Sequence, residues 1–528
     1  MCIVGNLYVN AKDKEYSYVY MNTQGCGDAL VISNKEEGKY NNSYIIQKDG
    51  KKFILRLNKK YEICYGDFIH IEGEYQKPQI ARNYKGFDYS IYLKSKNIYG
   101  IIISDKVEII KEKQISFFNL FINNIRNKIT YNIEKLFGKG NEAGLILGLL
   151  IGDKSLIDED VSNSFKDSSL AHVLAISGQH ISYIVLAITL LLKSICISKV
   201  KRKIITILVL IFFNFLVGFS PSIFRAGTMG ILIILSGIIY RKSDIFNNLA
   251  ISLLIIFLLN PFAIYNVGLW LSYGGVLGIV LFLKKLDINL ETNDNILKKL
   301  KDILLISVSA QIMIIPIMII NFNKISLMFW LSNLLTSPIV AICIILGFVI
   351  VFISFIQIKI ANFLAIPIKF LIQILINIAD LISKIPFSNL LITTPSLIWV
   401  IVYYLLLIIF INHAKQNKRE YMIEKKIKKS IMKNYKKLLL MIIVLILVIY
   451  VFQIFTRQLN IYFVNVGQGD CTLIVTKTRK TILIDGGGND SYDVGENILI
   501  PYLLDRGIST VDYIIISHFD SDHVRADF

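Results

Sequence analysis

The chain has 528 residues, of which 54% are hydrophobic, and it carries a formal net charge of +18. This composition excludes a single soluble domain, because apolar stretches of about 18 residues or more recur between residues 171 and 456, as in polytopic membrane proteins. In a soluble protein the positive charge would suggest a nucleic-acid partner. Here much of that charge flanks the apolar stretches, so membrane topology explains it first.

The amino-terminal part, residues 1–105, is polar and rich in strand signals. Its length and spacing predict a small β-barrel of about five strands, in the style of oligonucleotide/oligosaccharide-binding folds. Tyrosines at every second position from Tyr16 to Tyr20 predict one face of a strand. Two strand-like runs flank Asp49-Gly50, which is a strong hairpin signal. The tyrosines could stack nucleic-acid bases, although barrel core or ordinary strand surface is the commoner use of any one of them.

A connecting part, residues 115–165, follows the barrel. Apolar residues at helical spacing over 115–137, with polar residues between them, predict an amphipathic helix lying on the membrane or against the bundle. The remainder is expected to be a polar, acidic connector.

The membrane part, residues 171–456, contains about ten candidate spans. Lysine and arginine gather in alternate loops, the last of which, 413–437, has ten of them. Basic loops are retained in the cytoplasm, so both terminal parts are expected on the outer side of the cytoplasmic membrane. The expected spans lie near 171–192, 204–219, 223–240, 246–260, 265–283, 303–321, 328–357, 360–382, 391–412 and 438–456.

Polar and helix-breaking residues inside these spans point to a bundle with a hydrated interior. Each alone is more often a packing or capping residue. Arg225 is the strongest candidate, because an intramembrane arginine needs an anionic partner, water or substrate. The expected pore residues are His172, Ser177, Gln179, His180, Arg225, Gln311 and Asn333.

The last part, residues 459–528, predicts an α/β fold in which glycine-rich turns follow short strands. One strand ends near Asp470 and another at Asp485. A run that predicts a buried strand, 511–516, leads into four metal-ligand side chains within six residues. Such a cluster suits a two-metal site, where the metals lower the pKa of a bridging water; a solvated acidic loop is the alternative. The four ligands are His518, Asp520, Asp522 and His523.

These motifs, in this order, resemble one family along the whole chain: the ComEC-type bacterial channels for DNA internalisation during natural transformation. The barrel segment, the membrane motifs and the terminal motifs each have a counterpart there. The matching stretches are Asn83 with Gly86 to Tyr89, His172 to His180, Pro221 to Ala226, Gly268 to Ser272, Asn333 to Pro338, Val466 to Asp470, Leu483 to Gly487 and Ser517 to His523.

The resemblance implies that single-stranded DNA passes through the membrane part, that the barrel holds DNA, and that a metallo-β-lactamase-like domain hydrolyses the other strand. It also implies a divalent metal, zinc or manganese. Expected partners are single-stranded DNA, membrane lipid, a DNA receptor and a cytoplasmic ATPase or helicase. Carried onto this chain, His518 and Asp520 would bind one metal, Asp522 and His523 would bind the second and take the catalytic roles, and Asp470 and Asp485 would support the site.

The sequence departs from the family pattern at both ends. No membrane span precedes the barrel, and the Gly-Gly expected after His523 is absent. We therefore expect an internal portion of a longer protein, with a partial metallo-β-lactamase-like domain and no competent two-metal site. Two other functions stay open: a transporter or exporter of another substrate, and a membrane-anchored metallohydrolase that uses the bundle as a scaffold.

Overall fold

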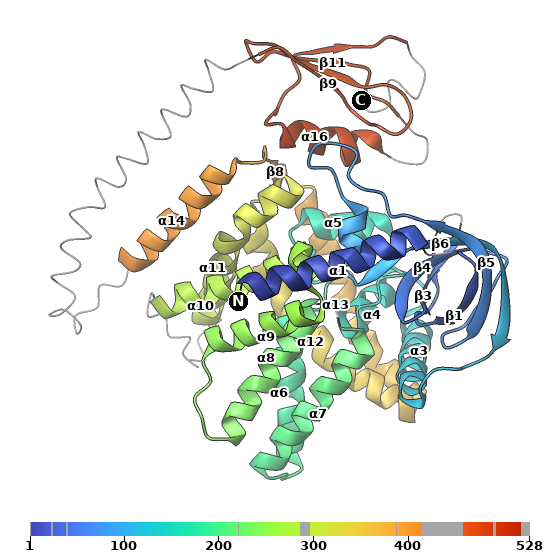
Figure 1. Ribbon diagram of the computed structural model, residues 1–528. Helices are drawn as coiled ribbons and strands as arrows, with labels where there is room; N and C mark the ends of the chain where they lie inside the picture. Colours follow the sequence, from blue (N-terminus) through green and yellow to red (C-terminus); the bar gives the residue numbers. More distant parts are fainter. Residues whose placement is uncertain are drawn as a thin grey trace.

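The structure is a computed structural model with three parts in chain order: a β-barrel with an amino-terminal helix, a helical bundle, and a small α/β unit (Figure 1). It describes residues 2–22, 25–38, 41–219, 221–285, 296–386, 388–413, 458–488 and 493–518.

The barrel closes because β1 pairs with both β5 and β3, giving the order β1-β5-β6-β4-β3 and back to β1, while β2 extends the sheet from β3. The predicted hairpin is present, with Asp49 and Gly50 at positive φ between β3 and β4. Buried side chains alternate along both strands, as expected when one face lines a core. The strands are β1 Gly27–Val31, β2 Glu36–Glu37, β3 Asn41–Lys48, β4 Lys51–Asn58, β5 Phe68–Gln76 and β6 Ile98–Lys111.

The prediction that Tyr16 to Tyr20 lie in a strand is wrong, because Cys2–Asn22 forms helix α1. Tyr16, Val19 and Tyr20 lie at helical spacing and face the barrel, whereas Tyr18 is 66% exposed. The ring of Tyr16 stacks on that of Tyr99, with centroids 4.1 Å apart. Alternate tyrosines also satisfy an i, i+4 pattern, and packing against residues distant in sequence selected the helix.

The barrel is anchored to the bundle through α2, Tyr89–Ser95, which lies between β5 and β6. Asp88 caps this helix by accepting a hydrogen bond from the Ile91 N–H. The Asn260 side chain, at the start of the short helix η1 (Pro261–Tyr265), donates to the carbonyls of Lys94 and Ser95 at 3.0 and 2.9 Å. The barrel therefore meets the bundle at the connection between α9, Ile245–Leu259, and α10, Val267–Lys285.

The amphipathic helix expected over 115–137 is present as α3, Phe117–Phe137, and its apolar face is buried against the bundle. The connector after it is not wholly polar. Helix α4, Asn141–Ile151, is buried along nearly its whole length, and α5, Glu159–Asp167, follows. Because α4 has 11 residues and no polar face, it shows neither a span nor an amphipathic pattern in the sequence.

Three helices among the described residues are long and apolar enough to cross a membrane, so the protein is a multi-pass membrane protein: Leu300–Phe322, Phe329–Ile356 and Ile358–Ser383. The helices at six other expected spans are shorter or more charged, and the tenth expected span, 438–456, lies outside the described residues. The bundle helices are α6 Gly178–Ser194, α7 Lys199–Val217, α8 Pro221–Ile238, α9 Ile245–Leu259, α10 Val267–Lys285, α11 Ile296–Phe322, α12 Phe329–Ile356, α13 Ile358–Ser383 and α14 Leu397–His413; β7 Lys324–Ser326 pairs with β8 Asn389–Leu391.

The carboxy-terminal unit is a four-stranded sheet in the order β12-β11-β10-β9, in which only β11 and β12 are parallel. The strand predicted over 511–516 is present as β12, but the prediction that it is buried is wrong, because its three residues are each about half exposed. The elements are β9 Asn460–Phe463, β10 Thr472–Val475, β11 Thr481–Ile484, η2 Gly495–Leu499, α16 Ile500–Asp505 and β12 Tyr513–Ile515.

Candidate functional site

Parallel pairing of β11 with β12 brings Asp485 beside Ser517 at the carboxyl ends of the two strands. The Asp485 N–H donates to the Ile515 carbonyl at 2.9 Å. The buried Asp485 carboxylate accepts from the Ser517 N–H at 2.8 Å and from the Ser517 hydroxyl at 2.7 Å. Asp485 has φ +53°, a left-handed conformation that aspartate tolerates better than most residues. These hydrogen bonds hold the strand ends in one arrangement.

The same network orients His518, whose Nδ1 lies 2.8 Å from the Ser517 hydroxyl oxygen. Because the Ser517 hydroxyl proton is directed at Asp485, its oxygen can accept from Nδ1–H, and in that tautomer Nε2 is the nitrogen with which His518 could bind a metal. An imidazole held in this way fits zinc or manganese. The other three predicted ligands, Asp520, Asp522 and His523, lie outside the described residues, and no metal-sized cluster of His, Cys, Asp or Glu occurs within the described part.

The turn that follows β9 lies close to the one that follows β11. Gly467 and Gly487 both have positive φ, and a Cβ atom built on Gly487 would lie 2.4 Å from the Val466 side chain. Glycine therefore permits this close approach. Asp470, predicted to support the site, is exposed in the first of these turns.

A second polar group lies in the bundle at the start of α6. The His180 Nδ1 accepts from the Ser177 N–H at 3.0 Å and lies 3.1 Å from the Ser177 hydroxyl. His180 is buried, and its Nε2 has no hydrogen-bonding partner among the described residues. This pair caps α6 and leaves one imidazole nitrogen facing the interior.

Arg225, on α8, lies beside that helix start. Its side chain is 4% exposed, and a Cβ atom built on Gly178 would lie 3.5 Å from its Nη2. The guanidinium carbon lies 5.5 Å from the ring centroid of Tyr273 on α10, and Nη1 lies 3.8 Å from the Met229 sulfur. Its Nε has no partner, and no described carboxylate forms an ion pair with it. Arg225 is thus a buried cation with no counter-ion in the part of the chain that the structure describes.

Sequence reasoning missed three further polar residues, one each on α7, α9 and α10. The Tyr273 hydroxyl is hydrogen-bonded to Ser252 on α9 at 2.7 Å. Asn214 on α7 packs on Gly227, and its Oδ1 has no partner among the described residues. A polar residue inside each apolar stretch is the only signal that the sequence offers for them.

The structure does not gather the remaining predicted pore residues around Arg225. His172 and Gln179 are exposed, and the His172 Nδ1 lies 3.0 Å from the Ser169 carbonyl oxygen in the turn before α6. The helix at the first expected span, α6, therefore begins at Gly178 rather than at residue 171. Gln311 is buried on α11 and Asn333 is half-buried on α12; among the described residues neither is hydrogen-bonded to Arg225 or His180.

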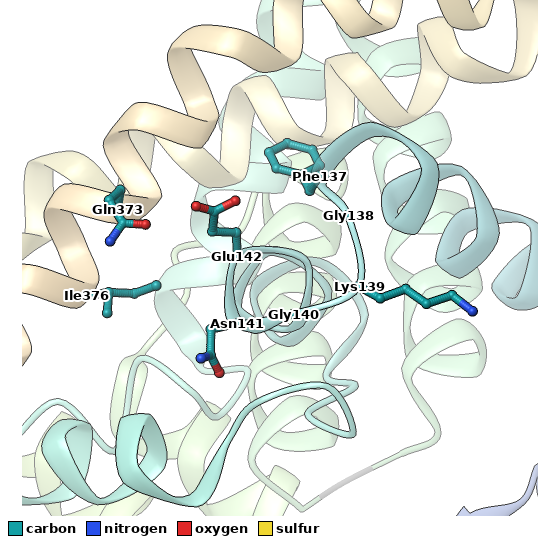
Figure 2. A pocket seen from close by; sticks show the side chains of 8 residues that line it. All are labelled: Phe137, Gly138, Lys139, Gly140, Asn141, Glu142, Gln373 and Ile376. Carbon is teal, nitrogen blue, oxygen red and sulfur yellow. The ribbon is translucent and has the colours of Figure 1, made fainter.

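A pocket of about 320 Å³ lies where α3 ends and α4 begins, opposite α13. Figure 2 shows Gln373 and Ile376 across from Glu142 and Asn141, with Lys139 pointing away. Glu142 forms an ion pair with Lys369 at 3.2 Å, and Asn141 donates to Asp158 at 2.7 Å. Because these polar groups are already paired and no predicted site residue lines the pocket, we assign it no chemistry.

Known protein families match this chain in the bundle and in the carboxy-terminal unit. Residues 149–417 match the family model of the Competence protein, and residues 464–526 match the Metallo-beta-lactamase superfamily. The chain is 21% identical over 516 residues to ComE operon protein 3 of Bacillus subtilis, covering 94% of this chain and 62% of that protein. It is 23% identical over 470 residues to Recombination protein 2 of Haemophilus influenzae, covering 84% and 57%. No solved structure matches the chain.

The chain thus spans less than two thirds of the length of these curated relatives. The competence model covers about half of the chain, and the barrel precedes it while the metallo-β-lactamase match follows it. This order is the one that the sequence motifs predicted, and the chain belongs to the ComEC-type family of competence proteins.

Proposed function

We propose that this chain translocates single-stranded DNA across the cytoplasmic membrane during natural transformation. The observation that carries the proposal is Arg225, a buried guanidinium without a counter-ion among the described residues. Family membership supports the same function, since the matching family model is that of the Competence protein and one relative is named Recombination protein 2.

An unpaired buried charge is costly, and breaking a buried ion pair typically costs about 3–5 kcal/mol. A transient anion removes that cost while it is bound. The amino end of α6, which lies against Arg225, adds the positive end of a helix dipole. The guanidinium fork matches phosphate oxygens. A polyanion with evenly spaced phosphates would offer Arg225 a new partner at each step, so the arginine would favour passage without holding one position.

The two terminal parts are proposed to lie outside the cytoplasm. The barrel contacts the bundle at Asn260. The carboxy-terminal unit contacts it at Asn323, which donates to Asp505 at 3.4 Å, and at Thr394, whose N–H donates to the Leu504 carbonyl at 3.0 Å. These three contacts fall in the interhelical connections that are poor in lysine and arginine. By the positive-inside rule such connections are extracytoplasmic, which supports the same side for both parts.

The metallo-β-lactamase match suggests metal dependence, and we propose that the metallo-β-lactamase-like domain, of which this unit is a part, acts on the DNA strand that is not transported. His518, held by Ser517 and Asp485, would bind the metal through Nε2, with Asp520, Asp522 and His523 as the further ligands. A bound metal would supply an activated water for hydrolysis. A DNA receptor and a cytoplasmic ATPase are the proposed protein partners.

Uptake of labelled DNA by cells that carry Arg225→Ala tests the pore role. We expect uptake to fall by roughly tenfold or more, since about 1.4 kcal/mol corresponds to a factor of ten. Arg241→Ala, which changes an exposed arginine beyond the other end of α8, is the matched control and should leave uptake unchanged. Normal uptake by Arg225→Ala at a normal membrane level contradicts the proposal, and a selective loss for another anionic substrate would identify a transporter of that substrate.

A further inference from the structure

The segment between β5 and α2, residues 77–88, extends from the barrel to the carboxy-terminal unit (Figure 1). The Asn83 side chain donates to the Asn465 carbonyl at 2.8 Å, and the Asn465 N–H donates back to Asn83 Oδ1 at 2.9 Å. The guanidinium carbon of Arg506 lies 4.2 Å from the ring centroid of Tyr84 and 4.1 Å from that of Tyr462. We call these contacts the Asn83 clasp.

The clasp fixes the segment beside the hydrolase-like site. Asn465 precedes Val466, which packs against Gly487 in the turn that follows β11. That turn begins at Asp485, whose carboxylate holds Ser517. Contacts therefore run without a break from the barrel segment to the loop edge at which His518 lies.

Three aromatic rings cluster on the same segment and the start of α2. Phe87 is 72% exposed and Tyr92 is 37% exposed, and their ring centroids are 5.5 Å apart. Tyr89 lies nearly parallel to Tyr92, with an interplanar angle of 20° and centroids 6.0 Å apart. The Lys96 ammonium lies 4.5 Å from the Tyr92 ring centroid. We call Phe87, Tyr89 and Tyr92 the aromatic shelf.

The chemistry of the shelf fits a nucleic-acid strand. The exposed rings leave apolar surface in water, and a base stacked on them would cover that surface. Base–aromatic stacking contributes about 1–3 kcal/mol per base and tolerates any sequence. Arg82, Lys85 and Lys96 are exposed nearby and complement phosphates. Asp88, between Phe87 and Tyr89 in the sequence, already accepts a hydrogen bond from the Ile91 N–H as the cap of α2.

We propose that the aromatic shelf stacks the bases of single-stranded nucleic acid and holds the strand next to the hydrolase-like site. This inference rests on the proposed function, because it names the contact by which that function would engage its substrate. The clasp favours nucleic acid over lipid as the occupant, since it joins the segment to the turns beside Asp485 and His518.

Binding of a fluorescent oligothymidylate to the full chain in detergent tests the proposal. The double variant Phe87→Ala with Tyr92→Ala should weaken binding by about tenfold or more, given about 1–3 kcal/mol per stacked base. The conservative double variant Phe87→Tyr with Tyr92→Phe should bind as the parent does, because both rings are kept. Phe117→Ala, which removes an 85% exposed ring from the start of α3, is the matched control and should bind as the parent does. Photo-crosslinks from an oligothymidylate in which iodouracil replaces some of the thymines should map to residues 84–96.

Equal binding by the double variant, or crosslinks confined to other segments, overturns the proposal. So does a double variant that binds DNA normally but no longer binds vesicles of phosphatidylglycerol and phosphatidylethanolamine, since the shelf would then be a membrane contact. Uptake by Arg225→Ala separates this failure from that of the proposed function. If shelf variants lose DNA binding while Arg225→Ala imports DNA normally, the shelf stands and the pore role of Arg225 falls.

Discussion

Replacing Asn83 by alanine removes the two hydrogen bonds of the Asn83 clasp, at 2.8 and 2.9 Å, and changes no other hydrogen bond of this side chain. Each bond contributes about 0.5–1.5 kcal/mol between partly exposed groups. The contact between the barrel segment and the carboxy-terminal unit should therefore weaken by about 1–3 kcal/mol, which is a factor of about 5 to 150 in its opening equilibrium.

Hydrogen exchange of the full chain in detergent measures this effect directly, because the Asn465 N–H is itself the donor of one bond. A peptide covering residues 460–470 should exchange faster in Asn83→Ala by that factor. Asn34→Ala is the matched control: it removes another side-chain hydrogen bond of the barrel, to Asn127 at 3.0 Å, and should leave that peptide unchanged. Unchanged exchange in Asn83→Ala would refute the clasp as a holding contact.

Three further predictions concern the bundle and the sheet. Gly227→Ala places a Cβ atom 2.3 Å from the Asn214 amide nitrogen and should destabilise the α7–α8 packing by about 1–3 kcal/mol, read as a lower melting temperature, whereas Gly275→Ala meets nothing within 4 Å and should not. Asp485→Asn keeps the left-handed φ but loses the charged acceptor for Ser517, so exchange protection of β11 and β12 should fall by about 1–3 kcal/mol; full protection would contradict the network. Hydrogen bonds from the Thr481 N–H and hydroxyl lower the pKa of Asp512, so this carboxylate stabilises the carboxy-terminal unit above the ordinary carboxyl pKa of 3.8, and the stabilisation is lost as pH falls through the lowered pKa. Cleavage of the unit by pepsin should therefore become faster over that pH range in the parent, relative to Asp512→Asn, which has no carboxylate to protonate.

Local signals in the sequence predicted the barrel well. The Asp49-Gly50 turn fixes the register of β3 on β4, and alternation along both strands identifies the buried face. Helix α1 was not predictable in the same way. Its tyrosines satisfy a strand pattern locally, and the choice of a helix depends on Tyr99 and on Phe262, whose ring centroid lies 5.4 Å from that of Tyr16. Those partners are distant in sequence, so periodicity alone does not reveal them.

The hydrolase-like site was predictable in its strand ends but not in its connections. Asp485 and His518 each follow a strand-like run, which is visible in the sequence. What the sequence does not show is the parallel pairing of Ile484 with Ile515, which carries Ser517 to the Asp485 carboxylate and turns two separate motifs into one network. Ser517 consequently had no assigned role before the strands were paired.

For the pore candidates too, the sequence shows the residues and the structure shows their contacts. A charged residue in an apolar stretch is easy to find, so Arg225 stands out in the sequence. Whether Arg225 has a functional role depends on the groups around it, which come from four helices. The amino end of α6 lies beside the arginine on α8, α10 contributes the ring of Tyr273, and α9 contributes Ser252, which is hydrogen-bonded to Tyr273. None of these contributes a carboxylate to Arg225. A structural arginine of this kind would be expected to have an acidic partner, because a buried ion without one costs stability. The lack of a counter-ion among the residues that the structure describes therefore separates Arg225 from Gln311 and Asn333, which are neutral and can be satisfied by ordinary helix packing.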